Sequence, residues 1–170
     1  MKQRPLRLVE NENRFAGLEP EDLNKSEAES VMALALRVLA ARHEKGQALE
    51  NPEQTQAYLR LHLAERPNEV FGCVLLDNKH RIIAVDELFQ GTIDGASVHP
   101  RVVVQRALQQ NCAAVLFFHN HPSGVSEPSQ ADVQITQRLK DALSLVEIRV
   151  LDHVVVATEG SVSFAERGLI

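Results

Sequence analysis

The chain has 170 residues, of which 44% are hydrophobic and 24% are charged. This is the composition of a globular domain long enough to bury its own core, and it excludes a disordered, collagen-like or coiled-coil chain. The 18 basic and 23 acidic residues give a net charge of −5 without any strongly basic segment, which lowers the expectation of nucleic-acid binding.

The sequence predicts a cytoplasmic protein with no membrane partner. No apolar run approaches the roughly 18 residues of a membrane span, and the first residues lack the apolar segment of a secretory signal. Cys73 and Cys112 both lie in apolar surroundings, which is typical of buried, reduced thiols.

Residues 1–67 are expected to form a polar arm followed by two helices. Ser26 and Glu29 have the spacing of a capping box, and apolar residues follow at helical intervals until Gly46. The second helix should begin at Asn51-Pro52, because proline is favoured at the first helical position. Its inner face is predicted to carry Ala57, Tyr58 and Leu61.

Residues 68–170 are expected to form one α/β domain. Apolar runs at 70–77 and 81–89, joined by a polar turn, are typical of a β-hairpin. The remaining elements are a helix at 100–111, a strand at 113–121, a helix beginning at Ser129, and strands at 148–158 and 161–166. The pattern predicts a mixed central β-sheet flanked by helices and preceded by a short helical N-terminal segment.

The stretch from His119 to Asp132 is the most informative part of the chain. His119 and His121 lie two residues apart at a strand end, so both imidazoles should face the same side. Asp132 falls in the first turn of the next helix, which should converge on the same sheet edge. Two histidines and one carboxylate, with a fourth position open to water, are the protein ligands of a catalytic zinc ion. We therefore expect one zinc ion per chain.

A zinc-bound water also needs a proton carrier, which is typically a carboxylate that does not bind the metal. Glu87 is the candidate, because strand alternation places it on the same face of its strand as three large apolar side chains. Burying a carboxylate among such neighbours is costly unless it has a partner or a functional role. These neighbours are Ile83, Val85 and Phe89.

Each of these residues also has a simpler interpretation. Ser129 and Asp132 have the spacing of a helix capping box, a pair of strand-end histidines is often incidental, and Glu87 could be an exposed edge residue. Their occurrence together favours the metal site, and an Asp132 that caps a helix can still face a metal ion.

Three further residues are candidates for roles in or near the site. His99 is expected at the surface near a helix start, whereas Arg101 could steer an anionic substrate group. His153 is expected to be buried and hydrogen-bonded, with a supporting role beside the site as the alternative.

Glu87, His119-x-His121-Pro122 and Ser129-x-x-Asp132 together resemble the JAMM, or MPN-plus, metallopeptidase signature. Over residues 68–170, a wider set of motifs is similar to the RadC family of that superfamily. These motifs are Glu87-Leu88-Phe89, Gly91-Thr92-Ile93, His99-Pro100-Arg101, His119-Asn120-His121-Pro122-Ser123-Gly124, Asp152-His153 and Ser163-Phe164-Ala165-Glu166-Arg167-Gly168.

The resemblance implies a fold of the cytidine-deaminase-like type. It also implies that His119, His121 and Asp132 bind zinc, that Glu87 is the general acid/base and that Ser129 donates a hydrogen bond to the transition state. Longer RadC proteins resemble a fusion of a helix-hairpin-helix region to this domain. Residues 1–67 contain no Gly-rich basic hairpin, so we expect that module to be absent or truncated, as in the short, prophage-type members.

The function expected from the sequence is zinc-dependent hydrolysis of a peptide or isopeptide bond in an unidentified protein or peptide. The alternative is a DNA-repair accessory or nucleic-acid-processing protein on the same fold, which the charge balance does not support. A nucleoside deaminase would need HxE and PCxxC motifs, which the sequence lacks. A non-enzymatic module would be expected to have lost a metal ligand, and none is lost. The oligomeric state is not predicted.

Overall fold

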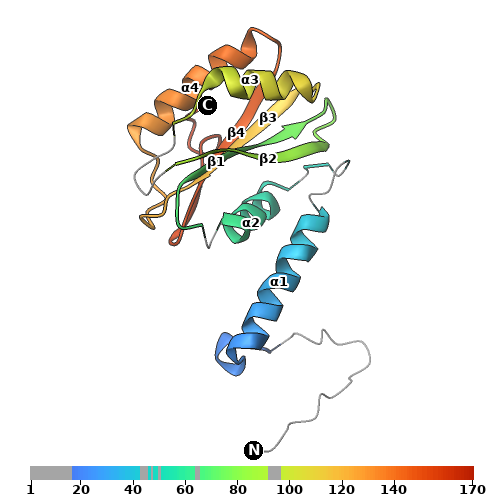
Figure 1. Ribbon diagram of the computed structural model, residues 1–170, viewed down its shortest axis with the longest axis vertical. Helices are drawn as coiled ribbons and strands as arrows, with labels where there is room; N and C mark the ends of the chain where they lie inside the picture. Colours follow the sequence, from blue (N-terminus) through green and yellow to red (C-terminus); the bar gives the residue numbers. More distant parts are fainter. Residues whose placement is uncertain (1–16, 43–45, 47, 50, 64–65, 92–96) are drawn as a thin grey trace, which may run out of the picture. The chain divides into compact units, whose positions relative to one another are not determined.

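A five-stranded mixed β-sheet forms the centre of the unit Leu36–Ile170 (Figure 1). Its strands are ordered β2-β1-β3-β4-β5, with β3 and β4 parallel and all other neighbours antiparallel. The strands are β1 (Val70–Leu76), β2 (Ile82–Gln90), β3 (Ala114–Asn120), β4 (Arg149–Ala157) and β5 (Gly160–Ser163). The predicted fold class, a mixed sheet flanked by helices, is confirmed.

The computed structural model describes residues 17–42, 46, 48, 49, 51–63, 66–91 and 97–170. Most of the predicted N-terminal arm and the Thr92-Ile93 part of one motif lie outside the described residues. Among the described helices, none has both the length and the apolar character that a membrane crossing requires.

The unit Met1–Ala35 contains a short 3-10 helix, Pro20–Asp22, and the first part of α1 (Lys25–Arg42). The predicted cap at Ser26 is wrong by two residues. Asn24 accepts a hydrogen bond from the Glu27 N–H at 3.0 Å, and the Glu27 carboxylate accepts one from the Asn24 N–H at 2.9 Å. Asn24 and Glu27 therefore form the reciprocal pair that was assigned to Ser26 and Glu29.

Helices cover both faces of the sheet (Figure 1). Helix α2 (Pro52–Leu63) packs on one face, over a core that includes Val74, Leu116 and Phe118. Helices α3 (Pro100–Gln109) and α4 (Gln130–Ser144) pack on the other face, over a core that includes Phe71 and Phe117. The central strands β1 and β3 are buried along their whole length, which explains why they read as continuous apolar runs.

Helix α2 belongs to the same unit as the sheet, so the boundary expected between residues 67 and 68 falls inside that unit. Its predicted inner face is only partly correct: Tyr58 packs against the core, but the buried positions differ from Ala57 and Leu61. Leu59 and Leu63 are buried at 0% and 2% exposure, together with Thr55, whereas Ala57 is exposed. The helix is therefore rotated relative to the prediction.

Strand β2 departs from the predicted alternation because it contains two β-bulges. The pairing with β1 skips Ile83 and Leu88, each of which is an extra residue on the β2 side. As a result, Val85 packs in the core beneath α2, whereas Ile83 and Phe89 pack on the α3/α4 face. The expectation that Ile83, Val85, Glu87 and Phe89 share one face is therefore wrong.

Two matched leucine variants test the observed orientation of α2. We expect Leu59→Ala to lower the free energy of unfolding by about 2–5 kcal/mol, because it empties a fully buried site. Leu61→Ala changes the same residue type on the same helix at a partly exposed site, and should have a clearly smaller effect. Urea denaturation measures both values. A larger loss for Leu61→Ala would contradict the observed packing.

Candidate metal centre

The histidine pair stands at the carboxyl end of the central strand β3. His119 is buried at 1% exposure, and its ring stacks on Phe71 with a centroid distance of 6.2 Å. His121 follows the last strand residue and is more open, and its Nε2 atom lies 2.9 Å from the Nε2 atom of His119. The strand thus directs both imidazoles to one place, as the spacing predicts.

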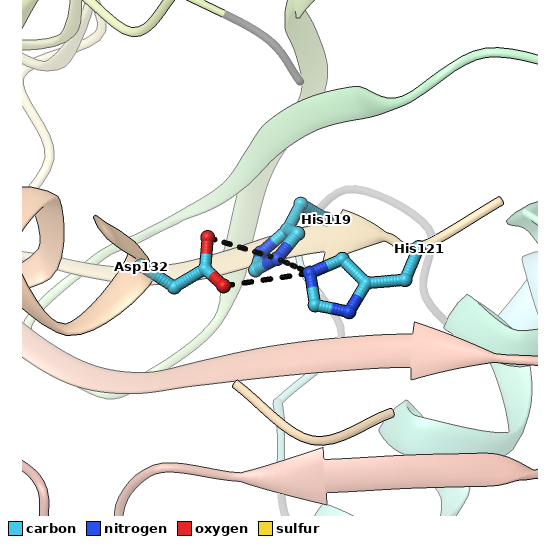
Figure 2. A group of neighbouring side chains, drawn as sticks. All are labelled: His119, His121 and Asp132. Atoms are coloured by element: carbon cyan, nitrogen blue, oxygen red, sulfur yellow. Dashed lines mark hydrogen bonds and ion pairs between the residues drawn. The ribbon is translucent and has the colours of Figure 1, made fainter. Parts of the chain in front are cut away.

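Asp132 reaches the same place from the first turn of α4. Its two carboxylate oxygens lie 3.4 Å from Nε2 of His119 and 3.4 Å from Nε2 of His121 (Figure 2). One ligand atom from each of the three residues lies within 4.8 Å of the others. The structure therefore brings together the three residues that were predicted to bind the metal.

Ser129 caps α4 and holds the Asp132 carboxylate. The Ser129 N–H and hydroxyl both donate to Oδ2 of Asp132, at 2.7 and 2.6 Å, and the hydroxyl oxygen accepts a hydrogen bond from the Asp132 N–H at 3.2 Å. The capping box and the metal-site arrangement therefore coexist. The hydroxyl hydrogen of Ser129 is directed at Asp132 rather than at the open side of the site.

The loop between the two histidines and α4 is fixed at several points. Nδ1–H of His121 donates to the Val125 carbonyl at 2.8 Å. Both the N–H and the hydroxyl of Ser126 donate to the Glu159 carboxylate, and Arg167 forms an ion pair with Glu127 at 2.7 Å. These contacts hold the relative positions of the strand end and the helix start.

A buried hydrogen-bond chain determines which nitrogen of His119 faces the site. The Thr136 hydroxyl donates its only hydrogen to the Asp132 carbonyl at 2.6 Å, so Nδ1–H of His153 must donate to the Thr136 oxygen, also at 2.6 Å. Burial holds the pKa of His153 well below its usual range, so this imidazole is neutral. Its Nε2 atom therefore accepts a hydrogen bond from Nδ1–H of His119 at 2.8 Å.

The consequence is that both imidazoles present a Nε2 lone pair to the site. His119 and His121 each use Nδ1–H in another hydrogen bond, so neutral rings leave both Nε2 atoms facing Asp132 without hydrogens. Two nitrogen lone pairs and a carboxylate need a cation between them, either a proton or a metal ion. This donor set, with each imidazole oriented by a second hydrogen bond, fits a zinc ion.

The electrostatics of the group also favour a bound cation. Asp132 accepts a hydrogen bond from His121 when that imidazole is protonated, which raises the pKa of His121, with smaller contributions from the Val125 carbonyl and the charges of Asp132 and Glu69. Burial raises the pKa of Asp132, but the hydrogen bonds that its carboxylate accepts from Ser129 and from His119 and His121 in their protonated forms outweigh burial and hold that pKa well below its usual range. The carboxylate is therefore anionic.

Glu87 is not brought to this group. It pairs with Gly72 of β1, which in turn pairs with Phe118 in the core beneath α2. Its carboxylate accepts hydrogen bonds from Arg66 at 2.7 Å and from His62 at 2.9 Å. His119 faces the opposite side of the sheet. The bulged strand therefore gives Glu87 a partner, and its predicted role beside the metal has no support in the geometry.

Glu69 is the carboxylate that the prediction missed. Phe71 lies opposite His119 in the antiparallel pairing of β1 and β3. Continuing this register by two residues in each strand brings Glu69, just before β1, opposite His121, just after β3, and both side chains lie on the same face as Phe71 and His119. Glu69 is partly buried, and its charge acts on the pKa of His121. The signal in the sequence was an acidic residue directly before a buried strand. Such a residue meets the end of an antiparallel neighbour.

The other candidates have clear positions. The prediction that His153 is buried and hydrogen-bonded is confirmed, and the residue supports His119 directly. His99 is exposed at the N-terminus of α3, where its side chain makes no capping hydrogen bond, as expected of a surface position. Arg101 is exposed on the same helix.

Comparison with known proteins identifies the family of this chain. A family model described as a RadC-like JAB domain matches residues 49–169. UPF0758 proteins of Thioalkalivibrio sulfidiphilus and Nitrosococcus oceani are 56% and 54% identical, each over 85% of this chain, and one of Vibrio cholerae is 57% identical over 84%. The chain spans 65%, 65% and 63% of the lengths of these relatives. The match over most of the chain, together with the histidine pair and Asp132, shows that the chain belongs to the RadC family.

Proposed function

We propose that this domain is a zinc-dependent hydrolase that cleaves an amide bond of a peptide or isopeptide substrate. The observation that carries the proposal is the convergence of two hydrogen-free Nε2 atoms, from His119 and His121, on the anionic Asp132. Membership of a JAB-domain family, which is associated with metal-dependent hydrolysis, supports the same chemistry. One position of the tetrahedral ion is left for water.

When bound, zinc lowers the pKa of its water to about 7 and polarises a substrate carbonyl. Glu69 would hold and move the proton between water and the leaving amine; the register that brings it opposite His121, on the face that the ligands share, supports this role. A carboxylate that does not bind the metal is the usual proton carrier at such sites. We therefore transfer the predicted general acid/base role from Glu87 to Glu69.

Ser129 acts first through Asp132, whose carboxylate it holds with two hydrogen bonds. Donation to a transition-state oxyanion would require its hydroxyl to change partner, and this role stays a prediction. The site does not support the nucleic-acid alternative. Nucleic-acid binding usually needs a basic surface for phosphate groups, and neither the three ligands nor Glu69 supplies one.

Zinc uptake tests the ligand set. We expect about one tightly bound zinc ion per wild-type chain, measured by equilibrium dialysis and metal analysis, and none in His119→Ala or Asp132→Ala. His99→Asn removes an exposed histidine outside the group and should retain the metal. Unchanged uptake by His119→Ala would contradict the assignment.

The hydrogen-bond chain behind His119 gives a second test. In Thr136→Val, Nδ1–H of His153 loses its acceptor, so His153 can change to the tautomer that carries its hydrogen on Nε2. That tautomer donates to Nδ1 of His119, which leaves the hydrogen of His119 on the Nε2 atom that should face zinc. We expect zinc affinity to fall about 10–100-fold, whereas Thr136→Ser keeps the acceptor and the affinity. The ring ¹⁵N shifts of metal-free protein should show the tautomer change. Equal zinc affinities for the two variants would refute this coupling.

A matched pair of variants tests the proton carrier. A panel of peptides and isopeptides first identifies a substrate that wild type cleaves. We then expect Glu69→Gln to keep its zinc but to lower kcat about 10²–10⁴-fold. Glu87→Gln should retain kcat, because Glu87 lies on the other face of the sheet. The opposite ranking of the two variants would restore Glu87 as the general acid/base.

A further inference from the structure

A pocket of about 560 Å³ opens between α2 and the ends of β3 and β4. Its wall includes His121 and Pro122 from the loop after β3, so it adjoins the candidate metal centre directly. Crevices at the carboxyl ends of neighbouring parallel strands are common places for ligands. A substrate whose scissile bond lies at His121 therefore has room to extend into this pocket.

Two arginines give the pocket a basic wall. Arg60 projects from α2, and within the part of the chain that the structure describes its guanidinium has no hydrogen bond or ion pair. Arg66 follows the helix and is held at 2.7 Å by Glu87, which also contacts His62. None of the described lining residues is acidic. Because Glu87 compensates the charge of Arg66, Arg60 supplies the uncompensated positive charge of the wall among the described residues.

The rest of the lining is small and aliphatic. Ala57, Leu61, Val156 and Ala157 are among the apolar lining residues, and no phenylalanine, tyrosine or tryptophan is among the described lining residues. Nucleobases are usually held by stacking on aromatic rings. A short aliphatic stem that ends in a carboxylate fits this lining better, because a guanidinium binds a carboxylate through two parallel hydrogen bonds.

We propose that this pocket binds a carboxylate-bearing residue of the peptide substrate, adjacent to the bond that is cleaved at the metal centre. The inference rests on the proposed hydrolase function and adds a substrate class to it. Arg60 is the specificity-determining residue, since its charge has no partner among the described residues. Arg66 lies at the pocket wall in an ion pair with Glu87.

The binding test uses the full chain and blocked dipeptides, so that it needs no hydrolysis. We expect the amide-blocked peptide acetyl-alanyl-glutamate to bind roughly five- to tenfold more tightly than its glutamine counterpart, measured by NMR titration, because a charge-assisted hydrogen bond is stronger than a neutral one. Arg60→Gln should abolish this preference. Arg138→Gln, an exposed arginine on α4, should leave it intact. Equal binding of the glutamate and glutamine peptides by wild type, together with equal binding of the free acid and the amide of acetyl-dialanine, would overturn the proposal.

A second arm distinguishes a side-chain carboxylate from a terminal one. Acetyl-dialanine is compared as the free acid and as the amide. If the free acid binds more tightly than the amide but the glutamate and glutamine peptides bind equally, the pocket recognises a chain terminus. If only the glutamate peptide binds more tightly than its counterpart, the pocket recognises an acidic side chain. Both results support carboxylate recognition. Displacement of the peptide by a short single-stranded oligonucleotide at lower concentration would overturn the proposal in favour of nucleic acid.

A cleavage assay separates this inference from the proposed function. On the substrate panel, replacement of an acidic flanking residue by its amide should raise KM for wild type, and Arg60→Gln should remove that difference in KM. Arg60→Glu should instead prefer a lysine at that position, a reversal that a merely structural role would not produce. Glutamate-selective binding without zinc uptake or hydrolysis would leave the pocket assignment standing and refute the hydrolase. Hydrolysis without any preference for an acidic residue would support the hydrolase and refute the pocket assignment.

Discussion

The hydrogen bond between the buried rings of His119 and His153 is the constraint on which the site depends. A neutral His153, with Nδ1–H committed to Thr136, can only accept a hydrogen bond at its other nitrogen. That requirement orients His119 and sets its tautomer before any metal binds. The Thr136 hydroxyl then passes the constraint to the Asp132 carbonyl, so the strand end and the first turn of α4 are joined through side chains.

The parts of the site that could be predicted are those encoded locally. The two-residue spacing of His119 and His121 at a strand end places both rings together, and the helix start at Ser129 fixes Asp132 three residues later. These relations depend only on strand and helix periodicity. The same holds for the elements themselves, since the buried strands are short apolar runs between strong turn signals.

The parts that could not be predicted depend on pairing between distant segments. Two bulges in β2 reverse the face that Glu87 would otherwise share with Ile83 and Phe89, and nothing in the local pattern marks them. Glu87 does have the partner that a carboxylate beside apolar residues requires, but this partner is Arg66 rather than a metal-bound water. Glu69 came to the site only through the register of β1 against β3, which a single sequence does not reveal.

The bulges in β2 have a consequence for the behaviour of the protein in concentrated solution. This strand forms one edge of the sheet, and a long, regular edge strand offers a row of free backbone groups to which another copy could add. The extra residues Ile83 and Leu88 interrupt that row. Near the start of the strand, the N–H of Gly46 already occupies the Ile82 carbonyl. The same two bulges that made the orientation of Glu87 unpredictable from the sequence thus protect the sheet from edge-to-edge aggregation.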